Sequence, residues 1–268
     1  MDDAVKRVAV LVIAATNQPV YRHYLAGYWT DLIRYTETEL PHIDVYLLVE
    51  HGHDRRLYAQ VKDHVIEDPI GDFDHLLPRH LQRLGTPSVL HKTIHALDVL
   101  GSDYDLFFRT NLSSMIRVTA FDGFVQSRAH IGYSGCWVWA DTLRDQLVAA
   151  DLVGPDQVIR HLSELDRYPG NSFISGSGFF LDTAQAARLV TCRGDLAYGL
   201  PDDVAIGLML EHHEVLRGFS ERIESTMLIA EMFDRIEHSS AAHIRLENFP
   251  VERAQALWRY LAKSESWR

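Results

Sequence analysis

The feature that most constrains the fold is an apolar run near the start of the chain. Residues 7–15 read RVAVLVIAA, and the β-branched residues in this run favour a strand. Because the run has no polar alternation, it predicts a strand buried on both faces, which is typical of a parallel sheet covered by helices. It is also far shorter than the roughly 20 residues of a membrane-spanning helix. We therefore expect an α/β protein with no membrane span.

Strands and helices alternate along the first 115 residues. Strands are predicted at 43–49, 61–66 and 104–109, and helices at 21–39 and 88–100. This alternation predicts a mostly parallel central sheet flanked by helices. Such sheets bind ligands beyond the carboxyl ends of their strands. Polar residues stand at two of these ends, Thr16-Asn17 and Thr110-Asn111, although each pair could also be an ordinary turn.

The second half of the chain has a less regular pattern. Residues 131–140 predict either a strand pair or a single strand that enters a wall of aromatic side chains. The other predicted elements are a helix at 155–166, a strand at 171–182, a helix at 183–190 and a helix at 200–213. Thr183 is placed to cap the helix that it begins. No linker rich in Pro, Gly or Ser separates the two halves. We expect one continuous domain over residues 1–268.

Charge and cysteine content narrow the possible partners and the compartment. The chain has 26 Lys and Arg against 37 Asp and Glu, a formal net charge of −11. Extended nucleic-acid binding and binding to anionic membranes need clustered positive charge, so this balance argues against both. Two cysteines are too few for a disulfide framework and fit a reducing cytosol. Asp2 and Asp3 have the wrong charge for the start of a signal peptide. We expect a cytoplasmic protein.

Two local patterns in the second half could carry chemistry. The tripeptide Gly176-Ser177-Gly178 interrupts an apolar strand, where glycine marks either a close approach by a ligand or a bulge. Asp202 and Asp203 open a predicted helix, where the helix dipole favours carboxylates. A carboxylate at that position could equally act as a general base if it reached an acceptor hydroxyl.

Three other groups of residues have both a structural and a functional interpretation. Lys92, on the helix before the 104–109 strand, could meet a phosphate as a point charge or be solvated. His243 and Arg245 fall on one side of a short extended segment, and they could bind a diphosphate or belong to a surface strand. The aromatic side chains of the 131–140 segment suit either the core or the apolar face of a sugar; they are Tyr133, Trp137 and Trp139.

Taken in order, these patterns resemble the inverting GT-A-fold glycosyltransferases of the β-1,3-galactosyltransferase and Fringe type. The resemblance covers roughly residues 92–207 and is softer over the N-terminal strands. Its blocks are Ser88–Thr93, Tyr104–Ser114, Tyr168-Pro169 with Ser175–Phe179, and Asp202–Gly207. The resemblance implies a GT-A-like, Rossmann-like fold. It also implies that a sugar is transferred, with inversion, from a nucleotide-sugar donor to a hydroxyl of a glycan, protein or small molecule. The expected donor is a UDP-linked sugar.

The resemblance also assigns roles to residues. Asp203 would be the catalytic base, and Gly176, Ser177, Gly178 and Asp202 would form the acceptor pocket. Residues 1–115 would be the nucleotide-binding half, and 116–268 the acceptor-binding and catalytic half. The donor-binding set would be Thr16, Asn17, Lys92, Arg109, Thr110, Asn111, Ser113 and Arg245, and His243 would lie near the diphosphate or its metal.

One departure from that family leaves open whether the protein binds a divalent metal ion. The family carries an Asp-x-Asp-like triplet after the central strand, whose last carboxylate holds Mn²⁺, whereas this chain has Asn111-Leu112-Ser113. Hard divalent cations such as Mn²⁺ or Mg²⁺ prefer carboxylate oxygens. Either the metal is weakly held, or cations neutralise the diphosphate instead, or the protein is a catalytically inactive sugar- or nucleotide-binding module. The candidate cations are Arg109, Lys92 and Arg245. A nucleotidyltransferase is a weaker alternative because it would need a pair of metal-binding carboxylates.

Overall fold

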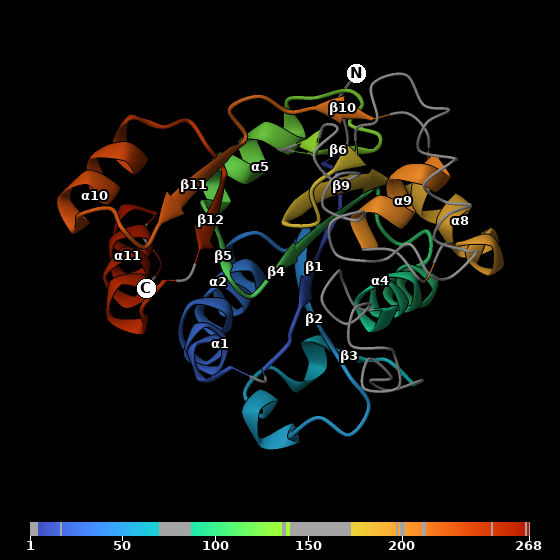
Figure 1. Ribbon diagram of the computed structural model, residues 1–268, viewed down its shortest axis with the longest axis horizontal. Helices are drawn as coiled ribbons and strands as arrows, with labels where there is room; N and C mark the ends of the chain where they lie inside the picture. Colours follow the sequence, from blue (N-terminus) through green and yellow to red (C-terminus); the bar gives the residue numbers. More distant parts are fainter. Residues whose placement is uncertain are drawn as a thin grey trace, which may run out of the picture.

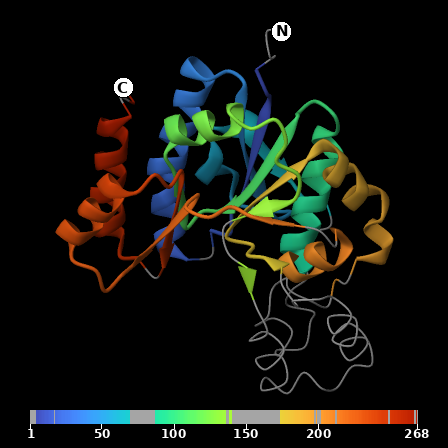
Figure 2. The same ribbon diagram turned by 90° about the horizontal axis from the view of Figure 1, so that it is seen from above.

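The computed structural model describes residues 5–16, 18–69, 87–135, 138–139, 173–196, 198, 202–210, 213–247, 249–265 and 267. Figure 1 shows a twisted central sheet with helices on both sides, and Figure 2 shows the same layers from above. The sequence predictions for Asn17, Trp137 and the helix at 155–166 lie outside these residues. Within the described part of the chain, no helix combines the length and the apolar character needed to cross a membrane.

The first strand forms the middle of the fold. β1 (Val8–Ile13) pairs in parallel with β2 (Ile43–Val49) on one edge and with β4 (Leu106–Asn111) on the other. Val8, Val10 and Val12 belong to one apolar core, whereas the alternate side chains, from Ala9 to Ile13, belong to a second core on the opposite face. The prediction of a strand buried on both faces is confirmed.

The described strands of the central sheet follow the order β10-β6-β9-β4-β1-β2-β3. The remaining members are β3 (Val65–Glu67), β6 (Ser134–Gly135), β9 (Gly178–Asp182) and β10 (Glu214–Val215). All of the neighbouring pairs are parallel except those of β9, which runs antiparallel to both β4 and β6. The predicted mostly parallel sheet is therefore confirmed. The strand order reverses at β1, between β2 on one side and β4 on the other, which is where ligands bind in open α/β sheets.

Two groups of helices cover the two faces of this sheet. One face carries α1 (Pro19–Tyr24), the π-helical turn η1 (Leu25–Trp29), α2 (Thr30–Glu39), α5 (Val118–Gln126) and α11 (Val251–Ser264). The other face carries α4 (Pro87–Leu100), α8 (Thr183–Thr191) and α9 (Asp202–Leu210). The helix predicted at 21–39 is confirmed, with the π-helical turn in its middle.

A second, smaller sheet brings the C-terminal part of the chain to the end of β4. Its order is β11-β12-β5, where β5 (Ser114–Ile116) follows β4 almost directly. β12 (His243–Glu247) is the middle strand, between β5 and β11 (Ser220–Glu224), and α10 (Ile229–His238) links β11 to β12 along the chain. Because the His243 side chain is fully buried, the surface-strand interpretation is wrong. A further pair joins β7 (Val138–Trp139) to β8 (Phe173–Ile174).

Several predicted boundaries and one predicted cap differ from the structure. The strand expected at 104–109 begins and ends two residues later, so Asn111 closes β4 instead of following it. Only the end of the 61–66 segment is extended, because residues 62–64 form a 3₁₀ turn before β3. The cap of α8 is Asp182, whose carboxylate accepts a hydrogen bond from the Gln185 backbone at 2.8 Å. The Thr183 hydroxyl instead donates to the Tyr104 carbonyl at 2.8 Å.

We expect Gly135→Ala to destabilise the fold by about 1–3 kcal/mol, because overpacking forces side chains and backbone to move. A Cβ at this buried position of β6 would overlap the Ile174 side chain and lie 2.9 Å from the Gly178 carbonyl oxygen. The matched control is Gly123→Ala on the exposed face of α5, where a Cβ meets nothing within 4 Å. Alanine in that helix should stabilise by about 0.5–1 kcal/mol. Urea unfolding of both variants measures the contrast, and equal effects would contradict this packing.

Candidate active site

Several predicted site residues meet at the carboxyl end of β4. Because β9 runs antiparallel to β4, its first residue, Gly178, lies opposite Thr110 at this edge of the sheet. The turn before β9 also reaches the first residues of α9, since the Gly176 backbone contacts Asp203. His243, the first residue of β12, contacts Thr110 as well. Segments that are far apart in the sequence therefore share one site.

The loop of residues 176–178 is tied to the end of β4 by side-chain hydrogen bonds. The Thr110 hydroxyl donates to the Ser177 carbonyl at 2.9 Å, and the Asn111 side-chain amide donates to the Gly176 carbonyl at 3.3 Å. A Cβ on Gly176 would lie 3.1 Å from the Arg109 Nη1 atom and 3.4 Å from the Asp202 Oδ1 atom. Glycine at this position therefore lets charged side chains approach the backbone closely, which is one of the two interpretations offered by the sequence.

Asp203 is held by two backbone N–H groups. Its Oδ2 atom accepts from Gly176 at 2.9 Å, and its Oδ1 atom accepts from Val204 at 3.0 Å. Burial is the largest influence on this carboxyl group and, together with the neighbouring Asp202, raises its pKa from 3.8 to about 7. The two N–H groups and Arg109 act in the opposite direction. A carboxylate with a pKa near neutrality can take up and release a proton at physiological pH.

Asp202 is engaged differently from its neighbour. Its Oδ2 atom lies 2.6 Å from the Nη2 atom of Arg109, and the two side chains are 13% and 3% exposed. The Arg109 guanidinium also lies over the Phe179 ring, 5.6 Å from its centroid. A buried guanidinium needs such a partner, because an unpaired buried charge is strongly destabilising. Asp202 therefore neutralises the charge of the buried Arg109 side chain.

His243 links the two sheets through hydroxyl groups. Its Nε2 atom lies 3.2 Å from the Thr110 hydroxyl, and its Nδ1 atom lies 2.5 Å from the Ser220 hydroxyl. Because the Thr110 proton is donated to Ser177, Nε2–H must donate to Thr110, and Nδ1 accepts from Ser220. Burial, followed by the charge of Arg245, lowers the pKa of His243 to about 3. The imidazole is therefore neutral and holds the end of β4 in place.

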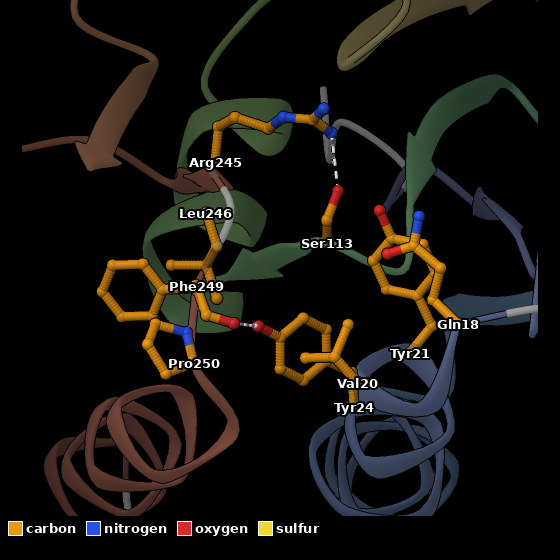
Figure 3. A pocket seen from close by; sticks show the side chains of 9 residues that line it. All are labelled: Gln18, Val20, Tyr21, Tyr24, Ser113, Arg245, Leu246, Phe249 and Pro250. Carbon is orange, nitrogen blue, oxygen red and sulfur yellow. Dashed lines mark hydrogen bonds between the residues drawn. The ribbon is translucent and has the colours of Figure 1, made fainter. Parts of the chain in front are cut away.

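A pocket of about 420 Å³ lies beside this site (Figure 3). It is formed between the start of α1, the β4–β5 turn, the end of β12 and the start of α11. Its lining residues are Gln18, Val20, Tyr21, Tyr24, Ser113, Arg245, Leu246, Phe249 and Pro250. The Arg245 Nη1 atom donates to the Ser113 hydroxyl at 2.7 Å, and the Tyr24 hydroxyl donates to the Phe249 carbonyl at 2.9 Å. The pocket combines an aromatic wall with a cationic end.

Two other predicted residues lie apart from these groups. The Lys92 ammonium group, on a side chain that is 3% exposed, donates to Glu50 Oε2 at 3.0 Å. Thr16 follows β1 as expected, and its carbonyl accepts from Arg22 Nε at 3.0 Å. Tyr133 is buried, so its interpretation as a core residue is confirmed.

Sequence reasoning missed some of the residues at these sites. Glu50 follows β2 directly, and the rule that selected Thr16 could have selected it. Gln18 and Tyr21 line the pocket, but in the sequence Tyr21 marks only the start of the helix predicted at 21–39 and no pattern singles out Gln18. Nothing in the local pattern marks Ser220 as a partner of His243, because the pairing of β11 with β12 creates that contact.

Comparison with known proteins gives only distant similarities. No protein-family model matches the chain, and no curated protein matches it either. Among solved structures, it resembles mouse xyloside xylosyltransferase 1 (11% identity, 91% of this chain and 97% of that chain, TM-score 0.47). It also resembles the galactosyltransferase LgtC in complex with donor and acceptor sugar analogues, with 9% identity over 96% of this chain and 95% of that chain and a TM-score of 0.48. A third similarity is to the bifunctional glycosyltransferase WbbM, with 10% identity over 91% of this chain and 46% of that chain and a TM-score of 0.47.

We expect Asp203→Asn to gain stability relative to the native chain as the pH rises. The folded chain keeps the Asp203 proton up to about pH 7, whereas the unfolded chain releases it near 3.8. The stabilisation from this proton is therefore complete below pH 3.8 and is lost as the pH rises to about 7. Because Asp203 is only partly buried as a residue, we expect a change on the order of 1–2 kcal/mol between pH 4 and pH 8.

Urea unfolding of both chains across this pH range measures the difference. Asp103→Asn, at an exposed position, removes the same formal charge and serves as the control. A difference between native and Asp203→Asn that stays constant with pH would contradict the raised pKa.

Proposed function

We propose that this protein is a glycosyltransferase that moves a sugar from a nucleotide-sugar donor to an acceptor hydroxyl. The observation that carries this proposal is the state of Asp203 at the start of α9. A carboxyl group whose pKa is raised to about 7 stands at the polar edge of the sheet, beside a glycine loop. A group with this pKa is suited to general-base catalysis near neutral pH.

The proposed reaction is a single displacement. Asp203 accepts the proton of the acceptor hydroxyl while that oxygen forms a bond to the anomeric carbon of the sugar. The bond from the anomeric carbon to the diphosphate oxygen breaks, and its electron pair leaves with the nucleoside diphosphate. Attack from the far side inverts the anomeric centre. The ion pair between Asp202 and Arg109, at 2.6 Å, engages the other carboxylate of this pair and so supports assigning the base role to Asp203.

The pocket beside the site suits the nucleotide part of the donor. Its aromatic wall offers Tyr21 and Tyr24 to a base or ribose, and Arg245 offers a positive charge to phosphate. Its volume of about 420 Å³ falls within the range of small-molecule sites. We propose a UDP-linked hexose as the donor, bound also by Thr16, Asn17 and Asn111 at the ends of β1 and β4. Thr110 was expected to share this role, but its side chain is fully buried and its hydroxyl is already bonded to Ser177 and His243.

The acceptor is proposed to lie on the other side of Asp203, against the 176–178 loop. In this arrangement, residues 1–115 supply the nucleotide-binding half of one domain and residues 116–268 the acceptor-binding half. The Gly176 and Ser177 carbonyls already accept from Asn111 and Thr110, and each has a second lone pair that a glycan hydroxyl could use. We place the reaction in the cytoplasm because the chain has only two cysteines.

We expect Asp203→Asn to lose at least about 100-fold in kcat while the donor still binds, because general-base catalysis contributes roughly that much. Turnover across a panel of nucleotide sugars, measured as nucleoside diphosphate release, identifies the donor. For the native chain, kcat/KM should rise with pH up to about 7 as Asp203 loses its proton. Asp103→Asn is the control for charge. Donor binding without turnover in the native chain would instead indicate a binding module, and no binding at all would overturn the proposal.

The stereochemistry of the product provides an independent check. With an α-linked donor, single displacement should give a β-linked product, which the anomeric coupling constant in proton NMR identifies. Spontaneous anomerisation of a free sugar would obscure this result, so the product should be a glycoside. An α-linked product would rule out the inverting mechanism while leaving sugar transfer intact.

A further inference from the structure

The segment where the resembling family places its metal-binding carboxylates makes other contacts in this protein. Leu112 is 2% exposed, and its carbonyl accepts from the Trp29 indole at 3.1 Å. The Asn111 side-chain amide donates to the Gly176 carbonyl. The Ser113 hydroxyl contacts the Arg245 guanidinium at 2.7 Å. The segment therefore presents an amide, an apolar side chain and a hydroxyl that is bonded to a cation.

These groups do not fit a divalent metal ion. Mg²⁺ and Mn²⁺ are held by anionic oxygens, and none of the three side chains carries a negative charge. An ion at Ser113 would also lie beside the guanidinium of Arg245, where two positive charges repel each other. Both ring nitrogens of His243 contact hydroxyl groups. Over the part of the chain that the structure describes, no three His, Cys, Asp or Glu residues form a group able to hold a metal.

Three cationic side chains were candidates to neutralise a diphosphate in place of a metal, and they differ in their contacts and in whether they line the pocket. The Lys92 side chain is 3% exposed and paired with Glu50. The Arg109 side chain is also 3% exposed, and it is paired with Asp202. Arg245 lines the 420 Å³ pocket, where Figure 3 shows its guanidinium at one end, above Ser113. A ligand in that pocket can contact Arg245, whereas neither Lys92 nor Arg109 is among the residues that line it.

We propose that Arg245, positioned by Ser113, binds the diphosphate of the donor and stabilises the leaving group, so that transfer needs no divalent metal ion. This inference rests on the proposed function. As the bond from the anomeric carbon to oxygen breaks, the electron pair stays on the terminal phosphate oxygen. The guanidinium donates hydrogen bonds to that oxygen, and the acceptor proton goes to Asp203. No further reactant is required for the step to balance.

The test is calorimetric binding of nucleoside diphosphates to the intact protein, first with EDTA and then with Mn²⁺. The probes are UDP, GDP, CDP and ADP, each compared with its own nucleoside. We expect one diphosphate to bind in EDTA, with an affinity that Mn²⁺ changes by less than about twofold. Arg245→Gln should lower the affinity for the diphosphate by about 10–100-fold, as expected for a lost charge-assisted contact, and leave the affinity for the nucleoside unchanged. Arg245→Lys should recover part of the loss.

Two controls and two contrary outcomes complete the experiment. Arg217→Gln removes a positive charge from an exposed position and should change neither affinity. Unchanged nucleoside binding by Arg245→Gln shows that its pocket is still folded. Diphosphate binding that requires Mn²⁺, or that survives Arg245→Gln undiminished, would overturn the inference and leave the proposed function standing. If no nucleotide binds with or without Mn²⁺, the proposed function fails.

Discussion

The pairing of β1 on both of its edges is the constraint on which the rest of the structure depends. β1 hydrogen-bonds to β2 and β4, and its side chains enter one apolar core on each face of the sheet. A strand enclosed in this way has no surface at which a polar ligand can bind except beyond its ends. The polar groups of the candidate site accordingly lie at the carboxyl edge, where β1 and β4 end and β9 begins.

At that edge, burial and a neighbouring ion pair both influence the carboxyl group of Asp203, and burial has the larger effect. Arg109 is fixed in β4, and its charge must be balanced because its side chain is 3% exposed. Asp202 supplies the balancing charge from the first turn of α9. The next residue, Asp203, has an adjacent negative charge and a buried carboxyl group, which together raise its pKa. The two consecutive aspartates therefore have different contacts: Asp202 forms the ion pair with Arg109, whereas Asp203 accepts from two backbone N–H groups.

The sequence was sufficient for the elements whose patterns are local. The apolar run of β1, the alternation of β2 and the carboxylates that open α9 all lie where they were expected. The cap of α8 was misplaced by one residue because both Asp182 and Thr183 can accept a backbone N–H, and only tertiary contacts direct Thr183 to Tyr104. Contacts between distant segments, such as Arg245 with Ser113, depend on sheet pairing, and residue types alone do not encode that pairing.

The neutral imidazole of His243 has a consequence for how the two sheets are coupled. From Ser220 through His243 and Thr110 to the Ser177 carbonyl, every hydrogen bond points in the same direction. Such a row of dipoles polarises each successive bond and is strengthened as a unit. The glycine loop beside Asp203 is therefore connected by a chain of hydrogen bonds to β11 of the smaller sheet. Removing the Ser220 hydroxyl would take away the first donor of this row and so weaken the bond that the Ser177 carbonyl accepts from Thr110, three hydrogen bonds away.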